Sequence, residues 1–434
     1  GSNNIAVGQD TLFANTVGNN NIAIGFQALV CNTASNNTAV GFTALKNNTT
    51  GTSNTAVGFY ALCSNTVGDN NTAVGREALR SGTTGRFNTA LGRYAGCSIN
   101  SNYNTAVGFS ALRYTTTGSS NTALGLEALK NNTLGSSNVG VGVQALKSNT
   151  TGNNNVSVGR DSLYCNTVGQ QNTAVGHYSL RQNTASHNTA LGFCALRSNT
   201  TGAYNTALGT RAAQNNTTGG KITAVGYGAL RNNTANQNTA VGYYALNLNT
   251  SGTGNSALGY RALRENTTGA SNTGVGFCAL FSNTTGTQNV AMGTCALLNN
   301  TTGGFNTGLG ANVLRYNTTG RYNVAVGRYA LIFNTVGSFN TAVGMHALCN
   351  NTADNNTAVG NFALANTTIG GINTAVGVNT LQHNTTGIAN TAVGAAALYN
   401  NIVGANNTAI GLEALRNNTA SNNTAVGFCA LRNN

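Results

Sequence analysis

Hydrophobic and polar residues alternate in one short pattern that recurs along the whole chain. The pattern reads Asn-Thr-Ala-Val-Gly-x-x-Ala-Leu, and it stands in full at Asn54–Leu62, Asn71–Leu79, Asn104–Leu112, Asn238–Leu246 and Asn423–Leu431. Aligned on the glycine, the chain holds 26 copies, and the step between copies is 17 residues nineteen times and 16 residues six times. Self-similarity at such a short, fixed period indicates one small structural unit stacked on itself, so the chain is an array and not a globule.

We number each repeat from its asparagine, so that Asn54 is position 1 of its repeat and Asn70 is position 17. Positions 2–4, here Thr55-Ala56-Val57, predict a short β-strand that ends at the glycine of position 5. The turn residues at 65–70 predict the return of the chain. A helix is disfavoured, because Gly, Asn and Thr form helices poorly and recur within every repeat.

Five positions carry most of the information in the pattern. Position 5 is Gly in all 26 copies, which predicts a positive φ or a close approach of two backbones. Position 9 is Leu in 24 copies, the exceptions being Gly96 and Ala213, and position 4 is always Val, Leu, Ile or Met. We expect the residues at positions 4 and 9 to point into the coil together. Asn at positions 1 and 12 is expected to form amide ladders, in which each side chain bonds its neighbours above and below.

The predicted architecture is therefore all-β, a narrow parallel β-solenoid or β-roll of about 26 coils with 16–17 residues per coil. Five of the six short repeats replace the turn Asn-Thr-Thr-Gly-x-x by Asn-Thr-Ala-x-x, which implies a tighter turn. The sixth, at Gly96–Tyr103, also lacks the leucine, and we expect a local defect there.

No change in composition divides the repeats, so the sequence predicts one continuous array over residues 1–434 with no internal boundary and no capping repeats. Both ends are ordinary repeat sequence. We therefore expect either a piece of a longer array or a chain that stacks head to tail into a filament.

Composition narrows the possible classes of protein. Charged residues make up only 7% of the chain, Pro and Trp are absent, and 56 residues are Gly. A polar chain with so little charge could be disordered, but the fixed phase of Val, Leu and Gly argues against disorder. The absence of Pro fits a backbone whose amides bond between strands. No apolar run approaches the roughly 18 residues that cross a bilayer, so we expect no membrane span.

The Asn-Thr-Ala-Val-Gly-x-x-Ala-Leu words, as at Asn54–Leu62, resemble the repeats of bacteriophage tail-fibre-type proteins and their bacterial relatives. They are also similar to the Asn-Ser-Val-Ala-Ile-Gly words of trimeric autotransporter adhesin heads. The resemblance covers essentially the whole chain. It implies a left-handed parallel β-roll and an extracellular fibre or adhesin, on a cell surface or a virion surface. It carries over no catalytic residue.

Basic residues concentrate at one position of the repeat. The net charge is +13, and 12 of the 21 Lys and Arg residues stand at position 10, which forms one column in a solenoid. Such a column could attract anionic surfaces, such as acidic polysaccharide, lipid headgroups or nucleic acid. The role we favour is solubility and mutual repulsion that deters side-by-side aggregation. The members of this basic column are Lys46, Arg80, Arg113, Lys130, Lys147, Arg181, Arg197, Arg231, Arg264, Arg315, Arg416 and Arg432.

Aromatic residues favour position 6. A column of rings is either a stacking surface for sugars or bases, or an interface that packs against itself or against a neighbouring chain, which is the commoner role. Members of this aromatic column include Phe26, Phe42, Phe59, Phe109, Tyr227, Tyr243, Tyr260, Phe277 and Phe428.

The sequence offers little that resembles a catalytic or metal site. The nine Cys form no Cys-x-x-Cys pair, and their odd number excludes full intramolecular pairing. Cys278 and Cys295 occupy the same position of successive repeats and should be neighbours. The nearest approach to a catalytic set is His346, Cys349 and Asp354 within one repeat, and chance is the favoured explanation because nothing elaborates it. The four His have no metal-ligand spacing. We predict no catalytic residue, no metal and no cofactor.

The leading hypothesis is an extracellular structural fibre or filament subunit whose partner is another copy of the chain, head to tail or side by side. The alternative is an adhesin module that binds cell-surface glycan or another anionic polymer. A remote alternative is ice binding through columns of Thr. Its weakness is that adjacent Thr residues point to opposite sides of a strand, which leaves no flat face with two ranks of Thr.

Overall fold

The structure is a computed structural model that describes residues 1–433, and it divides into two compact units. The first unit is Gly1–Gly220, and the second begins at Lys221. Both are built in the same way, because every repeat forms one coil and contributes one three-residue strand. Residues 1–433 contain strands and turns but no helix.

The first unit holds thirteen strands, one from each repeat. They are β1 (Ile5–Val7), β2 (Ile22–Ile24), β3 (Thr38–Val40), β4 (Thr55–Val57), β5 (Thr72–Val74), β6 (Thr89–Leu91), β7 (Thr105–Val107), β8 (Thr122–Leu124), β9 (Val139–Val141), β10 (Val156–Val158), β11 (Thr173–Val175), β12 (Thr189–Leu191) and β13 (Thr206–Leu208). The second unit holds thirteen more among its described residues. They are β14 (Thr223–Val225), β15 (Thr239–Val241), β16 (Ser256–Leu258), β17 (Thr273–Val275), β18 (Val290–Met292), β19 (Thr307–Leu309), β20 (Val324–Val326), β21 (Thr341–Val343), β22 (Thr357–Val359), β23 (Thr374–Val376), β24 (Thr391–Val393), β25 (Thr408–Ile410) and β26 (Thr424–Val426).

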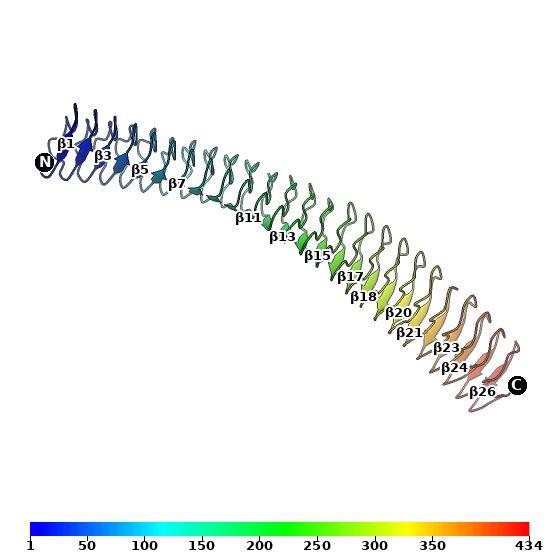
Figure 1. Ribbon diagram of the computed structural model, residues 1–434. Helices are drawn as coiled ribbons and strands as arrows, with labels where there is room; N and C mark the ends of the chain where they lie inside the picture. The colour runs from blue at the N-terminus through cyan, green and yellow to red at the C-terminus, as the bar shows by residue number, and fades with distance from the viewer. Residues whose placement is uncertain (434) are drawn as a thin grey trace. The chain divides into compact units, whose positions relative to one another are not determined.

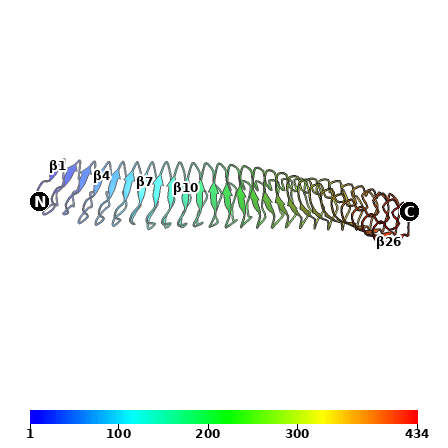
Figure 2. The same cartoon turned by 90° about the horizontal axis from the view of Figure 1, so that it is seen from below.

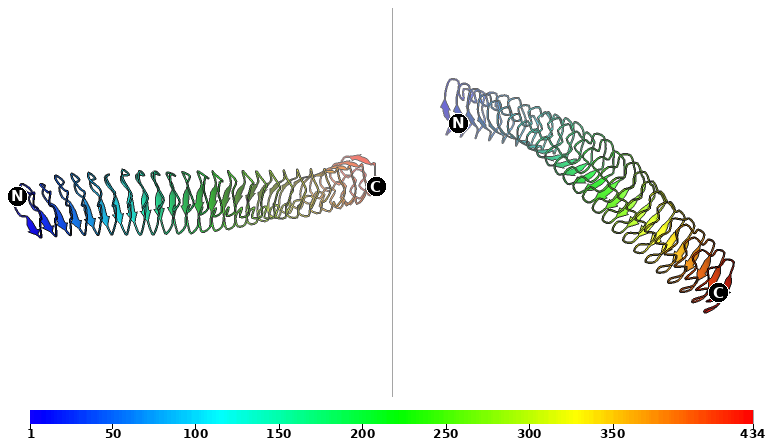
Figure 3. Two further views of the ribbon diagram at one scale, coloured as in Figure 1. Left: turned by 90° about the horizontal axis from the view of Figure 1, so that it is seen from above. Right: turned by 45° about the vertical axis from the view of Figure 1, so that its right-hand side comes forward.

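Within each unit, every strand pairs in parallel with the strand of the following coil, residue for residue. In the first unit Thr55 of β4 lies opposite Thr72 of β5, and in the second Thr273 of β17 lies opposite Val290 of β18. Figure 1 shows the succession of coils, and Figures 2 and 3 show the strands of each unit side by side along one face of its stack. The predicted all-β parallel solenoid is confirmed.

The interior of each coil is filled by two small side chains and one leucine. In the coil that begins at Asn54, Ala56 at position 3, Ala61 at position 8 and Leu62 at position 9 are all buried. The same three positions supply most of the buried hydrophobic residues in both units. The core is therefore a single narrow column of side chains that runs along the inside of the stacked coils.

Positions 3 and 8 face each other across the coil, and in two repeats a change at one is accompanied by a change at the other. Where both are serine, Ser157 and Ser162 hydrogen-bond each other. Where position 8 is enlarged to Val313, position 3 is reduced to Gly308, and a Cβ added there would lie 3.0 Å from Val313 Cγ1. In that coil the missing methyl group of position 3 makes room for the larger side chain at position 8.

Position 4 points outward, and our prediction that it joins the leucine inside the coil is wrong. Val57 is 36% exposed and Leu91 is 49% exposed, whereas Ala56 and Ala90 at position 3 are fully buried. The reason is the alternation of side chains along a strand. Asn at position 1 is buried, so positions 1 and 3 share the inner side and positions 2 and 4 share the outer side.

Position 5 requires glycine for both of the predicted reasons. Gly58 has φ +138°, and a Cβ added there would lie 2.6 Å from the carbonyl oxygen of Gly75 in the next coil. Positions 7 and 9 are also left-handed although they are not glycine, with φ 57° at Tyr60 and φ 50° at Leu62. A left-handed conformation costs an L-residue roughly 1–2 kcal/mol. Burial of the leucine and bonding between coils must offset this cost in each coil.

The asparagine columns form as predicted, with a different bond at each position. At position 12, Asn65 Nδ2 donates to Asn48 Oδ1 of the preceding coil at 2.7 Å. At position 1, Asn54 Oδ1 accepts the backbone N–H of Asn71 in the following coil at 2.9 Å. Asn54 Nδ2 and Asn65 Nδ2 both donate to the carbonyl of Gly68, at 2.8 and 3.0 Å. The two columns close each coil at its turn and join it to its neighbours.

The short repeats form the tighter turn that their sequence predicts. Asn21 Nδ2 and Asn32 Nδ2 donate to Ala34 O at 2.9 and 2.8 Å, so an alanine carbonyl replaces the glycine carbonyl. The change interrupts the position-12 ladder. Asn166 Oδ1 and Asn334 Oδ1, each one coil before a short repeat, are buried without a hydrogen-bond partner.

The irregular repeat at Gly96–Tyr103 keeps its strand pairing and its position-1 asparagine bonds but loses the position-12 amide ladder. Position 12 is Gly82, Ile99 and Thr115 in three successive coils. Ile99 is 1% exposed and occupies the space of the missing leucine, since a Cβ added at Gly96 would lie 2.8 Å from Ile99 Cδ1. The hydroxyl of Thr115 is buried without a partner. The predicted defect is confirmed. It changes the turn, where Asn100 Oδ1 accepts the backbone N–H groups of Thr83 and Thr84, but not the sheet, because β6 still pairs with β7.

Candidate functional site

The outer sheet face, which we define as the side chains at positions 2 and 4 within one unit, carries a continuous apolar column. Position 4 is apolar in every repeat, and Leu124, Leu191 and Leu258 are 47%, 50% and 49% exposed. Position 2 is mostly Thr, held in register from strand to strand, as where Thr38 lies opposite Thr55. Neither position holds a charged residue in any repeat. The face is therefore neutral, regular and largely apolar.

The aromatic column stands at position 6, beside this face, and its rings stack on one another. The ring centroids of Phe26, Phe42 and Phe59 are separated by 5.1 and 5.2 Å. In the second unit, the run from Tyr227 to Phe277 has spacings of 5.1–5.5 Å. Since the faces of most of these rings are covered by neighbouring rings, the column presents mainly ring edges and offers little surface on which a base or sugar could stack.

The remaining two predicted members of the aromatic column lie apart from these runs. Phe109 packs edge-on against Tyr94, with 6.2 Å between ring centroids. Phe428 is 76% exposed. The aromatic column is thus a set of separate short stacks.

The basic column at position 10 is partly neutralised by acids. Lys130 Nζ and Lys147 Nζ, from successive coils, lie 2.7 and 2.8 Å from the two carboxylate oxygens of Glu127, and Gln144 Nε2 donates to the same carboxylate at 3.0 Å. Hydrogen bonds from Lys130 and then Lys147 lower the pKa of Glu127 to about 2. The same carboxylate raises the pKa of Lys147.

Two further acids form ion pairs with the basic column. Arg80 Nη1 lies 2.9 Å from Glu77 Oε2, and this hydrogen bond raises the pKa of Arg80. Glu413 binds Arg416 at 3.3 Å and Arg432 of the next coil at 2.8 Å. At each point a cation of the column faces a carboxylate.

Most other members of the basic column lie over aromatic rings. Arg181 Cζ and Arg197 Cζ both lie 5.4 Å from the ring centroid of Tyr178, and Arg113 Cζ lies 4.4 Å from that of Tyr94. Similar contacts join Arg264 to Phe281 and Arg315 to Tyr316. Lys46 and Arg231 make no ion pair among residues 1–433. Ring contacts and carboxylates therefore hold much of the column against the coil surface.

The three residues of the candidate catalytic set are engaged separately. The ring of His346 stacks on Phe362, with 4.9 Å between centroids. Asp354 Oδ1 accepts the backbone N–H of Ser338 at 2.7 Å. Burial raises the pKa of the Cys349 thiol. Within residues 1–433 no hydrogen bond joins these three side chains, so the structure does not assemble them into a site.

The cysteines are all free thiols. Cys278 and Cys295 are neighbours, as expected from their shared position. Burial, and to a smaller extent the nearby thiol of Cys295, raises the pKa of the Cys278 thiol. In the described part of the chain, no group of three His, Cys, Asp or Glu side chains is placed to hold a metal ion.

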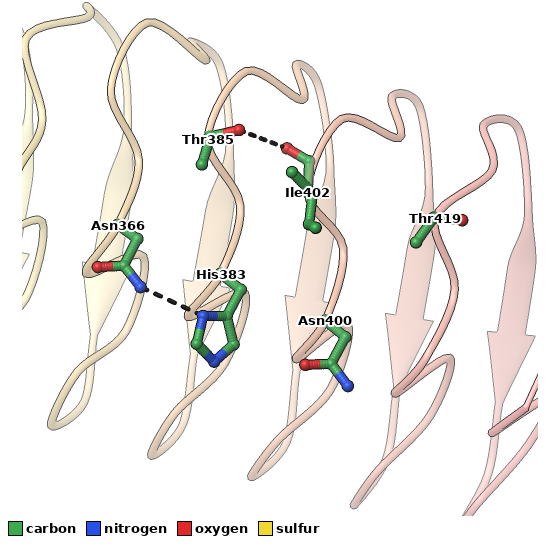
Figure 4. Close-up of a pocket in the computed structure, with 6 residues that line it drawn as sticks. All are labelled: Asn366, His383, Thr385, Asn400, Ile402 and Thr419. Carbon is green, nitrogen blue, oxygen red and sulfur yellow. Dashed lines mark hydrogen bonds between the residues drawn. The ribbon is translucent and has the colours of Figure 1, made fainter.

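A groove on the second unit escaped the sequence analysis. Its volume is about 520 Å³ (Figure 4). Position 11 forms one side and position 13 the other, and the lining residues are Asn366, His383, Asn400, Thr385, Ile402 and Thr419. The one sequence signal that could have marked it is Ile402, which stands where neighbouring repeats have Thr.

Residues 1–433 include no helix long and apolar enough to cross a bilayer. Comparison of the chain with protein-family models and with curated proteins gives no match.

Proposed function

We propose that the chain is a structural fibre subunit whose copies associate side by side through the outer sheet face. The observation that carries the proposal is the apolar residue at position 4, which is present in every repeat and is exposed or half-exposed in each of them. These side chains lie outside the coil, so packing of the coil interior does not explain them. Soluble monomers rarely expose a contiguous apolar patch larger than a few hundred Å². Burying such a face contributes about 25 cal/mol for each Å² of apolar area.

The outer sheet face suits a second copy of the same chain. Its side chains repeat once per coil, so a copy that meets one coil correctly also meets the next. The face carries no charge that association would have to desolvate. A self-complementary patch of this kind typically gives a closed symmetric oligomer. As part of the proposal, the fibre lies outside the cell or on a virion, which the resemblance of its repeat words to tail-fibre and adhesin repeats supports.

The test measures the oligomeric state of the full chain by sedimentation velocity over a range of concentrations. We expect the unmodified chain to form a discrete oligomer at micromolar concentration, and the Leu124→Lys/Val141→Lys variant to shift toward monomer. The matched control is Leu134→Lys, because Leu134 is 54% exposed but stands at position 14, away from the outer sheet face. Circular dichroism checks that each variant keeps its β structure.

Two results would overturn the proposal. The first is an unmodified chain that stays monomeric at every concentration. The second is a Leu134→Lys control that disrupts the oligomer as strongly as the double variant does, since the effect would then come from added charge in general.

A second candidate function is binding of an anionic polymer along the basic column. It is favoured by the convergence of cations from successive coils, as where Arg181 and Arg197 meet at Tyr178. The case for this second function is weakened by the carboxylates and rings that already engage much of the column. Polyanion binding measured over a salt series should show a linear fall of log K with log salt concentration. Arg181→Ala/Arg197→Ala should reduce that slope, and the absence of binding at low salt would remove this candidate.

A further inference from the structure

The groove of the second unit runs across successive coils between two columns of side chains. In Figure 4, Asn366, His383 and Asn400 form one row, and the row of Thr385, Ile402 and Thr419 lies opposite. Its volume of about 520 Å³ lies within the range of small-ligand sites, roughly 300–1,000 Å³. No Lys, Arg, Asp or Glu lines it. A ligand would therefore be selected by hydrogen bonds and shape, because no charge is available to select it.

Hydrogen bonds of the lining residues leave two polar groups unused among residues 1–433. Asn366 Nδ2 lies 3.3 Å from His383 Nδ1, and donation across this contact places the imidazole hydrogen on Nε2, which becomes a free donor. Asn400 Nδ2 donates to Asn417 Oδ1 at 2.8 Å, which leaves Asn400 Oδ1 as an acceptor. The groove thus offers one donor and one acceptor.

The groove also has an apolar element between its polar groups. Ile402 is 48% exposed, and it interrupts the row of threonines at position 13. The hydroxyl of Thr385 donates to Ile402 O at 3.0 Å, so the methyl group of Thr385 is held in place beside it. A wholly apolar ligand would leave the two free polar groups without partners, and an ionic ligand would find no counter-charge. Sugars combine hydroxyl groups with C–H faces and satisfy both elements.

We propose that this groove binds a short segment of a neutral glycan chain. The segment would lie along the stack, with hydroxyl groups bonded to His383 Nε2–H and Asn400 Oδ1, and with a C–H face against Ile402. The site goes beyond the proposed fibre function and does not depend on it. The groove uses positions 11 and 13, whereas the outer sheet face uses positions 2 and 4, so a fibre could assemble and bind glycan at the same time.

The experiment presents the full chain to an array of neutral and anionic oligosaccharides at physiological ionic strength, and the affinity of each hit is then measured by titration calorimetry. We expect neutral oligosaccharides among the hits. The His383→Ala/Asn400→Ala variant should bind them at least about tenfold more weakly, because it loses two hydrogen bonds. Ile402→Trp, which fills the groove, should abolish binding. The matched control is Asn47→Ala, which removes an exposed amide from position 11 in the first unit and should bind as the unmodified chain does.

The proposal is overturned if no neutral oligosaccharide binds, or if the groove variants bind as well as the control. Hits confined to anionic glycans and lost at higher salt would assign binding to the basic column and also overturn it. Sedimentation of His383→Ala/Asn400→Ala separates this proposal from the fibre. The variant should assemble as the unmodified chain does, so failure of glycan binding leaves the test of side-by-side association intact.

Discussion

The position-12 column differs between two regions of the molecule. In the second unit it forms an unbroken amide ladder from Asn233 to Asn334, with bonds of 2.7–2.9 Å between successive side chains. In the first unit the same column is interrupted at Gly82, Ile99 and Thr115. Both regions nevertheless keep the same parallel pairing and register, as in β17–β18 and β6–β7.

The comparison shows that two kinds of interaction hold the coils together. The backbone bonds, the glycine of position 5 and the asparagine bonds of position 1 are common to both regions, so the coil forms with these and without the position-12 ladder. The position-12 ladder is absent from one region, so it adds stability to a coil that already forms. Ile99 supplies apolar burial where both the leucine and the amide are missing.

The largest expected effect comes from the element that the two regions share. A Cβ at Gly276 would lie 2.5 Å from Gly293 O, and one at Gly92 would lie 2.8 Å from Gly108 O, both at strongly positive φ. We expect Gly276→Ala and Gly92→Ala each to lower the local free energy of unfolding by at least about 3 kcal/mol. Hydrogen exchange of the surrounding amides measures this loss. A cost below about 1 kcal/mol at either site would show that the backbone contact is not essential.

The next largest loss of stability is expected only where the position-12 amide ladder is intact. Asn283→Leu keeps the side-chain volume but removes the bonds to Asn266 and Asn300, at 2.7 and 2.8 Å, and leaves a buried oxygen unpaired. We expect a loss of about 2–4 kcal/mol in local stability, measured by hydrogen exchange of the same coils. Thr115→Val is the matched control in the interrupted region. Its hydroxyl already lacks a partner, so the change should cost less than about 0.5 kcal/mol. Equal losses of stability at the two sites would contradict the conclusion that the position-12 ladder adds stability beyond the interactions common to both regions.

The coil, its glycine and its asparagine columns could be predicted because each is periodic and each has one chemical explanation. The direction of position 4 was also within reach of the sequence. Buried ladders at position 1, as at Asn54, place position 3 on the same side and position 4 on the other, and Val57 follows that rule. We assigned the larger apolar residue to the interior, although the coil has room there only for alanine.

Other features had no clear signal in the sequence. Leu62 adopts a left-handed backbone that leucine does not favour, and only the closed path of the coil imposes it. The groove depends on the spacing between two columns of side chains. The single replacement of threonine by Ile402 is too weak a signal to predict it from the sequence. The pairing of Gly308 with Val313 could not be predicted from the sequence, because nothing in the repeat indicates that positions 3 and 8 face each other.

The interrupted region itself can be restored in two steps. Gly96→Leu alone should destabilise the coil by about 1–3 kcal/mol, because the new side chain would meet Ile99, whose Cδ1 lies 2.8 Å from an added Cβ. Ile99→Asn alone should also destabilise it, because it empties the leucine space. The Gly96→Leu/Ile99→Asn variant recreates the regular pair and should recover at least about 1 kcal/mol relative to the sum of the single changes. Thermal unfolding of the four proteins gives this coupling, and strict additivity would show that Ile99 does not replace the leucine.

The smallest effect concerns the ion pairs next to the interrupted region, where Glu127 joins Lys130 of its own coil to Lys147 of the next. The pKa of Glu127 is lowered from 4.5 to about 2, so its contribution is complete above pH 4.5 and is lost as the pH falls toward 2. Relative to Glu127→Gln, the unmodified chain should be more stable at neutral pH by about 1 kcal/mol or less, since the group is near the surface. That advantage should vanish by about pH 2. Melting temperatures of both proteins across this range decide the point. A difference in melting temperature that persists unchanged at pH 2 would contradict this prediction. It would mean that the packing of the Glu127 side chain, and not its charge, stabilises the contact between these two coils.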